Sequence, residues 1–246
     1  MNDSLHSDAQ AIFEDGLQAV SPSDCVKRVV SLEGLNLNIS GKNYDLNGIT
    51  RIIVIGAGKA TPAMALALEE ILGEKITDGL ITTKYGHKLP LSNIETVECG
   101  HPVPDENGVN ATLRLLQKIS KLSSDTLIIC LFSGGGSSLL PSPAEGITLE
   151  EKQETTKLLL ETGCTIDEIN TIRKHISKSK GGLIAKAAHP AKIVSLILSD
   201  VIGDKLDTIA SGPTYPDNTT FRDCLGIIEL YNLENKLPKR VHRLIR

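Results

Sequence analysis

Short apolar runs alternate with amphipathic stretches through the middle of the chain. The runs RIIVI (51–55), TLIICLF (126–132) and IVSLIL (193–198) contain almost no polar position. A strand that is buried on both faces of a parallel sheet has this composition, because helices cover both of its sides. Two further strands are expected at 79–83 and 94–98. The alternation of strands and helices predicts an α/β fold, with a Rossmann-like parallel sheet and helices on both faces.

Apolar residues at helical spacing lie between and before these runs. Within residues 8–20, Ile12, Phe13 and Leu17 fall on one helical face, which predicts an N-terminal helical segment. Residues 24–35 carry apolar positions that predict a second helix. The remaining helices are expected over 63–72, 108–122, 148–162, 166–177 and 183–188.

The segment Gly56-Ala57-Gly58-Lys59 lies between the first apolar run and a predicted helix N-terminus. Gly56 and Gly58 allow the backbone to approach a ligand, helix N–H groups favour anions, and Lys59 adds a positive charge. The segment lacks the four residues that a Walker A loop has between its first Gly and its Gly-Lys. It also lacks the third Gly of the dinucleotide fingerprint. We expect an anion site here, with a tight turn and a solvent-exposed lysine as the alternative.

Three consecutive glycines, Gly134, Gly135 and Gly136, follow the second apolar run between Ser133 and Ser137. Such a run costs conformational entropy, which is justified where backbone N–H groups wrap an anion and hydroxyls add further donors. A flexible loop is the alternative. A nucleophilic serine is disfavoured because the hydrolase elbow G-x-S-x-G is absent. The segment therefore predicts a second site for phosphate or another anion.

Asp200 follows the last apolar run, in the segment SDVIGD. A carboxylate at the end of a strand can bind Mg²⁺ or take a proton from a hydroxyl. A turn in which the aspartate bonds its own backbone is the alternative. His87 and His101 lie in loop-like segments, without the spacing of a metal site. Magnesium therefore has Asp200 as its one candidate ligand, and no metal site is assigned firmly.

Basic residues gather around Gly181-Gly182. They are Arg173, Lys174, Lys178, Lys180 and Lys186. A solvated helix face is the usual explanation for such a stretch, but cations beside two candidate anion loops also suit a phosphorylated ligand.

Composition removes several classes of function. The chain has 26 Lys and Arg against 30 Asp and Glu, a formal net charge of −4, which gives no basic footprint for nucleic acid or an anionic membrane. Aromatic residues are 3% and Trp is absent, which disfavours a base-stacking platform. The longest apolar stretches are far below the roughly 20 residues that span a bilayer. The five cysteines contain no C-x-x-C pair, a pattern that favours a reducing, cytoplasmic compartment.

Six segments occur in a fixed order along the chain. They are IGAGKA (55–60), TKYGH (83–87), GHPVPDENG (100–108), LFSGGGSSLLPSP (131–143), NTIRKHISKSKGG (170–182), and LSDVIGD followed by IASGPTYPD (198–217). Together they resemble the ATP-dependent glycerate 2-kinases of the MOFRL-containing family. Some members of that family carry the label hydroxypyruvate reductase, which the incomplete nicotinamide fingerprint does not support.

The resemblance implies transfer of the ATP γ-phosphoryl group to D-glycerate, giving 2-phosphoglycerate, with Mg²⁺. By motif, Lys59 and Asp200 match the catalytic lysine and aspartate of the family. Gly56, Gly58, the loop from Ser133 to Ser137, and Arg173 match its other landmarks and are expected to bind the cofactor. The family has a large Rossmann-like N-terminal domain, a smaller MOFRL domain and an active site in the cleft between them.

Residues 1–246 are expected to be the N-terminal domain of such a kinase, incomplete at its C-terminal end and without the MOFRL domain. Expected partners are D-glycerate, ATP and the missing MOFRL half, supplied within a longer chain or by a separate one. The alternatives are a non-catalytic remnant that binds an anion or a nucleotide, and a nicotinamide-dependent reductase. A homo-oligomer is left open.

Overall fold

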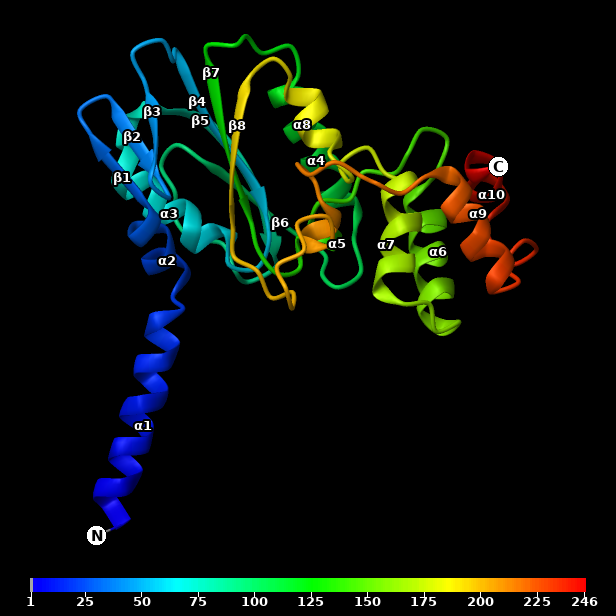
Figure 1. The fold of residues 1–246 in the computed structure, drawn as a ribbon, viewed down its shortest axis with the longest axis horizontal. Helices are drawn as coiled ribbons and strands as arrows, with labels where there is room; N and C mark the ends of the chain where they lie inside the picture. The colour runs from blue at the N-terminus through cyan, green and yellow to red at the C-terminus, as the bar shows by residue number, and fades with distance from the viewer. Residues whose placement is uncertain (1) are drawn as a thin grey trace.

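Five parallel strands form the central sheet, in the order β6-β5-β4-β7-β8. The computed structural model describes residues 2–246. The strands are β4 (Arg51–Ala57), β5 (Ile76–Lys84), β6 (Glu95–Cys99), β7 (Thr126–Phe132) and β8 (Lys192–Ile197). Helices cover both faces of this sheet (Figure 1). The predicted α/β fold with a parallel sheet is therefore confirmed, and the apolar runs are its central strands.

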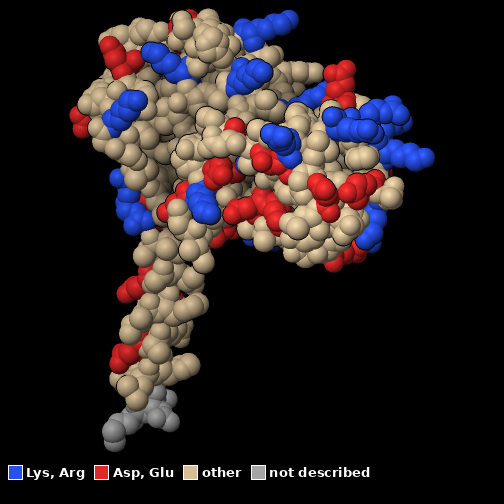
Figure 2. Space-filling model, turned by 45° about the vertical axis from the view of Figure 1, so that its right-hand side comes forward, with Lys and Arg blue, Asp and Glu red and all other residues tan. Residues whose placement is uncertain are grey.

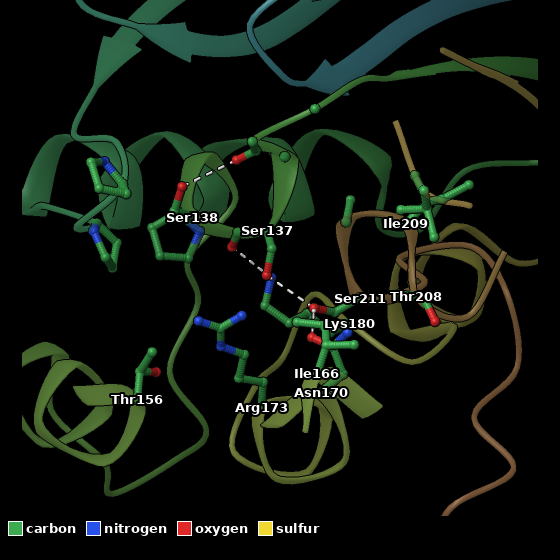
Figure 3. Close-up of a pocket in the computed structure, with 18 of the residues that line it drawn as sticks. Ser137, Ser138, Thr156, Ile166, Asn170, Arg173, Lys180, Thr208, Ile209 and Ser211 are labelled. Atoms are coloured by element: carbon green, nitrogen blue, oxygen red, sulfur yellow. Dashed lines mark hydrogen bonds between the residues drawn. The ribbon is translucent and has the colours of Figure 1, made fainter. Parts of the chain in front are cut away.

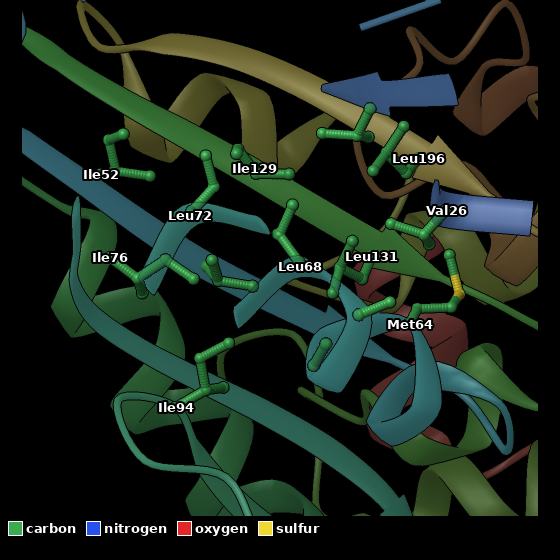
Figure 4. Packing of buried hydrophobic residues seen from close by; sticks show 14 of the residues in the cluster. Val26, Ile52, Met64, Leu68, Leu72, Ile76, Ile94, Ile129, Leu131 and Leu196 are labelled. Atoms are coloured by element: carbon green, nitrogen blue, oxygen red, sulfur yellow. The ribbon is translucent and has the colours of Figure 1, made fainter. Parts of the chain in front are cut away.

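Side chains of the sheet alternate between two cores. The helices that cover its faces are α2 (Pro22–Val29), α3 (Thr61–Leu72), α4 (Glu106–Ile119) and α8 (Leu183–Ala188). In β4, Ile52 and Val54 pack with α2 and α3, as Figure 4 shows for Ile52 beside Leu72 and Leu68. The intervening Ile53 packs with α4 and α8 on the other face. This two-residue period explains why β4 and β7 are apolar at nearly every position after the first.

The N-terminal part differs from the prediction. The first helix is present as α1 (Asn2–Ala19), and it extends away from the body of the molecule (Figures 1 and 2). The predicted helix over 24–35 is wrong beyond Val29. An antiparallel sheet follows instead, made of β1 (Val30–Glu33), β2 (Asn36–Ile39) and β3 (Lys42–Asp45). Gly34 and Gly41 have positive φ and turn the chain between these strands, and the alternation of burial in β2 follows a period of two.

Four helices form a separate unit beside the sheet. They are α6 (Leu149–Glu161), α7 (Ile166–His175), α9 (Phe221–Leu230) and α10 (Lys239–Ile245), and they share a third hydrophobic core. The predicted capping box of α6 is present, with Thr148 and Glu151 bonding each other's backbone N–H groups. The short helix α5 (Gly136–Leu139) lies between the sheet and the α6–α7 pair (Figure 1). The 3₁₀ turns η1 (Gly73–Lys75) and η2 (Ile209–Ser211) complete the fold.

The carboxyl ends of β4, β7 and β8 meet at one edge of the sheet because the three strands are parallel neighbours. The segments that follow them are those singled out from the sequence: the loop after β4, the glycine loop after β7 and the turn at Asp200 after β8. Ligands of open α/β sheets bind at this edge. Within residues 2–246, no helix is long and apolar enough to cross a membrane.

Candidate functional site

The loop after β4 packs tightly against the start of the glycine loop. A Cβ at Gly58 would overlap the Oγ of Ser133 and lie 2.8 Å from its backbone nitrogen, so only glycine fits there. The N–H of Lys59 donates to the carbonyl of Gly134 at 3.0 Å, and the N–H of Ala60 donates to Ser133 Oγ at 3.0 Å. Gly58 donates to a carbonyl of β5. These N–H groups bond the protein itself, so the two loops position each other.

The glycine loop itself has free donors. The N–H groups of Gly134, Gly135 and Ser137 donate to no acceptor among the described residues, whereas that of Gly136 donates to the carbonyl of Ser133 at 3.1 Å. Gly135 has a φ of 86°, a left-handed conformation that glycine adopts without strain. Successive N–H groups without an acceptor form a concavity that suits an anion. The loop is therefore ordered with free donors, and the anion site stays a prediction that this geometry allows.

Asp200 lies directly against the glycine loop. A Cβ at Gly134 would overlap the Asp200 carboxylate, which places that carboxylate at the loop's surface. The turn after β8 is closed by Ser199, whose Oγ accepts from the N–H of Val201 at 3.1 Å. Asp200 is exposed and has no hydrogen bond or ion pair with any described residue. Its carboxylate is free to accept a proton or bind a cation, unlike the self-bonded turn considered from the sequence.

His101 also borders the glycine loop. Its Nε2 would lie 2.7 Å from a Cβ at Gly135. Burial lowers the pKa of His101, and the positive charges of Lys59 and Lys84 lower it further. Lys59 is therefore close enough to His101 to act on it electrostatically, and its own side chain is exposed. The imidazole stays neutral near pH 7, and Lys59 and Lys84 supply the positive charge near it.

A pocket of about 310 Å³ lies between the glycine loop and the α6–α7 pair. Figure 3 shows Arg173 extending from α7 into the space between Ser137 and Thr156. Asp200 also lines this pocket, whereas Lys59 does not. The carboxylate that faces the glycine loop therefore also faces the pocket.

Three cations line the pocket. Lys180 is 1% exposed and its Nζ donates to the carbonyl of Ser137 at 2.7 Å. Lys152 of α6 is 5% exposed and its Nζ donates to the carbonyl of Ile176 at 3.1 Å. Among the described side chains, residues 4–246, no carboxylate forms an ion pair with either lysine or with Arg173. Burial and the charge of Arg173 lower the pKa of Lys152 to about 7, and burial, Lys152 and Arg173 lower that of Lys180 well below its ordinary value.

Comparison with known proteins places the chain in a family. The sequence profile of the family described as "Domain of unknown function (DUF4147)" matches residues 8–246. The chain belongs to the DUF4147 family. A D-glycerate 2-kinase of Thermotoga maritima is 45% identical over 233 residues, which are 94% of this chain and 52% of that protein. A crystal structure of a protein from Pyrococcus horikoshii OT3 has a TM-score of 0.90 and 39% identity, covering 98% of this chain and 54% of that one.

A further relative carries a different name. A protein of Agrobacterium vitis, named as a candidate hydroxypyruvate reductase, is 48% identical over 183 residues, which are 74% of this chain and 48% of that protein. The resemblance to glycerate 2-kinases that rests on the six motifs is confirmed by the relatives, including the mixed naming. The chain spans about half the length of the curated relatives that it matches.

The basic residues around Gly181-Gly182 have different surroundings in the structure. Arg173 and Lys180 line the pocket. Lys174 is buried and pairs with Asp217 at 2.9 Å, which ties α7 to the segment before α9. Lys178 and Lys186 are exposed. Only part of the stretch is therefore available to a ligand in the pocket.

Several pocket residues were not predicted. Ser137 Oγ lies 2.9 Å from Ser211 Oγ, and Ser211 donates to Asn170 Oδ1 at 3.1 Å, so three hydroxyl and amide groups form one network. Ala210 and Ser211 have φ of 51° and 61°, a strained left-handed conformation for residues with a Cβ. Lys152 has no sequence signal, because a lysine in an amphipathic helix has the pattern of a surface residue.

Proposed function

We propose that this chain is the part of a glycerate 2-kinase that carries the phosphoryl-transfer machinery. Together with a second, C-terminal part, it transfers the γ-phosphoryl group of ATP to the 2-hydroxyl of D-glycerate and yields 2-phosphoglycerate and ADP. The proposal rests on one observation. The Lys59 loop, the free N–H groups of the glycine loop and the unpaired carboxylate of Asp200 lie together where the parallel strands end. The name of the Thermotoga maritima relative supports the substrate.

The reaction assigns each group a physical task. Phosphoryl transfer depends mainly on positioning and on stabilising the negative charge that develops on the transferred group. Free N–H groups of Gly134, Gly135 and Ser137 bind phosphate oxygens, and the Lys59 ammonium neutralises charge on the transferring group. Asp200 orients the attacking hydroxyl and accepts its proton. The new bond forms between the glycerate oxygen and the γ-phosphorus, and the bond from that phosphorus to the β–γ bridging oxygen breaks.

Magnesium fits this site in one mode. The side chains of residues 4–246 contain no cluster of three or more metal-binding groups. Mg²⁺ at nucleotide sites keeps several waters and is held by one or two carboxylates together with substrate phosphates. Asp200 has the free carboxylate that this mode requires, so it would hold the ion as the alternative to accepting the proton. When bound, the ion would neutralise phosphate charge.

A nicotinamide-dependent reductase is a weaker proposal. Dinucleotide binding uses the glycine-rich turn after the first strand, where backbone N–H groups contact the pyrophosphate. Here the N–H groups of Gly58, Lys59 and Ala60 already donate to protein acceptors. The cofactor role predicted for Gly56 and Gly58 is therefore best understood as indirect, since these glycines let the first loop support the second. A cytoplasmic location remains part of the proposal, in keeping with the five free cysteines.

Reconstitution tests the proposal. The chain is purified and mixed with the C-terminal half of the Thermotoga maritima relative, and phosphorylation of D-glycerate is followed with ATP and Mg²⁺. Wild type is expected to be active in the mixture. Lys59→Met and Asp200→Asn are expected to lose activity by roughly 10²-fold or more, as groups that act on the transition state do. Lys178→Met, which removes an exposed lysine outside the site, serves as the matched control.

Two outcomes would contradict the proposal. Near-wild-type activity of the folded Lys59→Met chain would remove the task given to Lys59. If the mixture phosphorylates no D-glycerate although the wild-type chain is folded and binds ATP or phosphate, a non-catalytic binding protein is favoured.

A further inference from the structure

In the pocket between the glycine loop and the α6–α7 pair, three basic side chains lie close to one another. Lys152 comes from α6, Arg173 from α7 and Lys180 from the segment after α7, so three separate stretches of chain bring cations to one space. Buried cations without a carboxylate partner lose hydration and repel one another. The nearest carboxylate in the pocket, Asp200, forms no ion pair with them. Such an arrangement is stabilised when an anion enters.

The other walls of the pocket define the size and chemistry of that anion. Ser137, Asn170 and Ser211 form a polar wall of linked side chains, and Ile166 and Ile209 add apolar surface. The volume of about 310 Å³ accommodates a small organic acid. No aromatic side chain lines the pocket for an adenine ring to stack on.

Two groups of basic side chains lie near the glycine loop. Lys59 and Lys84 lower the pKa of His101 and do not line the pocket, whereas Lys152, Arg173 and Lys180 do line it. Asp200 lies against the loop and also lines the pocket. A kinase of a hydroxy acid has to hold two anions, the phosphates and the carboxylate, close together while limiting their repulsion. Two separate cationic sites meet that need.

We infer that this pocket is the carboxylate subsite for the acid substrate, with Arg173, Lys152 and Lys180 binding the carboxylate and Asp200 facing the adjacent hydroxyl. The inference rests on the proposed function and deepens it. Arg173 is thereby assigned to the acid substrate, whereas its motif predicted cofactor binding. The planar guanidinium suits a carboxylate because it donates two parallel hydrogen bonds.

Binding of the carboxylate is coupled to protonation of Lys152. The charged groups that face Lys152 are Arg173 from α7 and Lys180 from the segment after it. Near pH 7 part of the Lys152 population is neutral, because its pKa is about 7. A bound carboxylate favours the ammonium form, so protons are taken up as the acid binds. A pocket without a titrating lysine shows no such uptake.

Isothermal titration calorimetry of the whole chain tests the subsite without catalysis. D-glycerate and, separately, a non-hydrolysable ATP analogue are titrated at pH 7 in two buffers of different ionisation enthalpy. Arg173→Gln and Lys180→Met are expected to weaken D-glycerate binding at least tenfold. Arg173→Gln is also expected to leave the affinity for the ATP analogue within about twofold. Lys152→Met is expected to reduce proton uptake without abolishing it, because burial also lowers the pKa of Lys180. Lys178→Met, an exposed lysine of the same segment, is the matched control.

The outcomes separate this inference from the proposed function. A folded wild-type chain that does not bind D-glycerate overturns the subsite, as does a loss of ATP-analogue binding in Arg173→Gln with D-glycerate binding unchanged. A third outcome separates the two. If D-glycerate binding depends on Arg173 but the reconstituted mixture transfers no phosphate, the proposed function is contradicted and the subsite is supported. Circular dichroism of each variant checks the fold. If Lys180→Met does not fold, Arg173→Gln alone tests the subsite, because Arg173 is only half-buried.

Discussion

Replacing Lys152 by methionine is expected to change how the stability of the chain depends on pH. Lys152 is almost fully buried, and burial together with Arg173 lowers its pKa from 10.5 to about 7. In the unfolded chain the lysine regains its ordinary pKa. Between those two values the unfolded state binds more protons than the folded state, so the free energy of unfolding of the wild type rises with pH. Below pH 7 both states are protonated and the penalty of the buried charge is constant.

The magnitude follows from the two pKa values. One pKa unit corresponds to about 1.4 kcal/mol. From pH 7, where the folded lysine is half deprotonated, to pH 9, the wild type gains about 2 kcal/mol from this group. The methionine side chain of the Lys152→Met variant does not titrate, so the stability of the variant relative to wild type should fall by about 2 kcal/mol over that range.

Urea unfolding at pH 7, 8 and 9 measures this difference. Lys157→Met is the matched control, because Lys157 lies on the same helix, is exposed, and has only a long ion pair with Glu161 at 3.8 Å. Its stability difference from wild type should stay constant with pH within about 0.5 kcal/mol. If the Lys152→Met difference is equally constant, Lys152 is not a buried cation with a lowered pKa, and the account of the pocket's charge is refuted.

Three further results are expected. Gly56→Ala should lower the free energy of unfolding by about 2–3 kcal/mol in urea titrations, since its Cβ would overlap the carbonyl oxygen of Leu131 on β7; an unchanged midpoint would contradict the tight packing of β4 on β7. Gly226→Ala, in an open position on α9, should raise stability by about 0.5–1 kcal/mol in the same assay, and a loss would contradict its open surroundings. In NMR titrations, Lys59→Met should raise the pKa of His101, because one of the positive charges that lower it is removed; an unchanged pKa would show that the two side chains are not close.

The sheet could be predicted because its signal is local. A strand such as β7, buried on both faces, is apolar at every position after Thr126, and its predicted limits match the observed ones. The helix predicted over 24–35 failed at Val30, where the apolar residues fit a helical face as well as one side of a strand. The decision there depends on pairing with β2 and on the turn at Gly34, which a short window of sequence does not reveal.

The candidate site could be predicted where it follows from topology. Lys59, the glycine loop and Asp200 each follow a strand, and neighbouring parallel strands end at one edge, so these groups had to meet. The pocket cations could not be predicted as a set. Lys152 and Lys180 come together because the α6–α7 pair packs beside that edge, and nothing in their local sequence distinguishes them from exposed lysines such as Lys178.

The most direct test of the central claim is ³¹P NMR of the product that the reconstituted mixture forms from ATP and D-glycerate. Phosphate on the 2-hydroxyl is bonded to a carbon with a single hydrogen, so its resonance should split into a doublet, and ADP should accumulate in equal amount. The account predicts that doublet, together with its loss when Asp200→Asn replaces wild type. A triplet would place the phosphate on the 3-hydroxyl, and ADP with inorganic phosphate alone would show that no glycerate is phosphorylated; either result would contradict the proposed function.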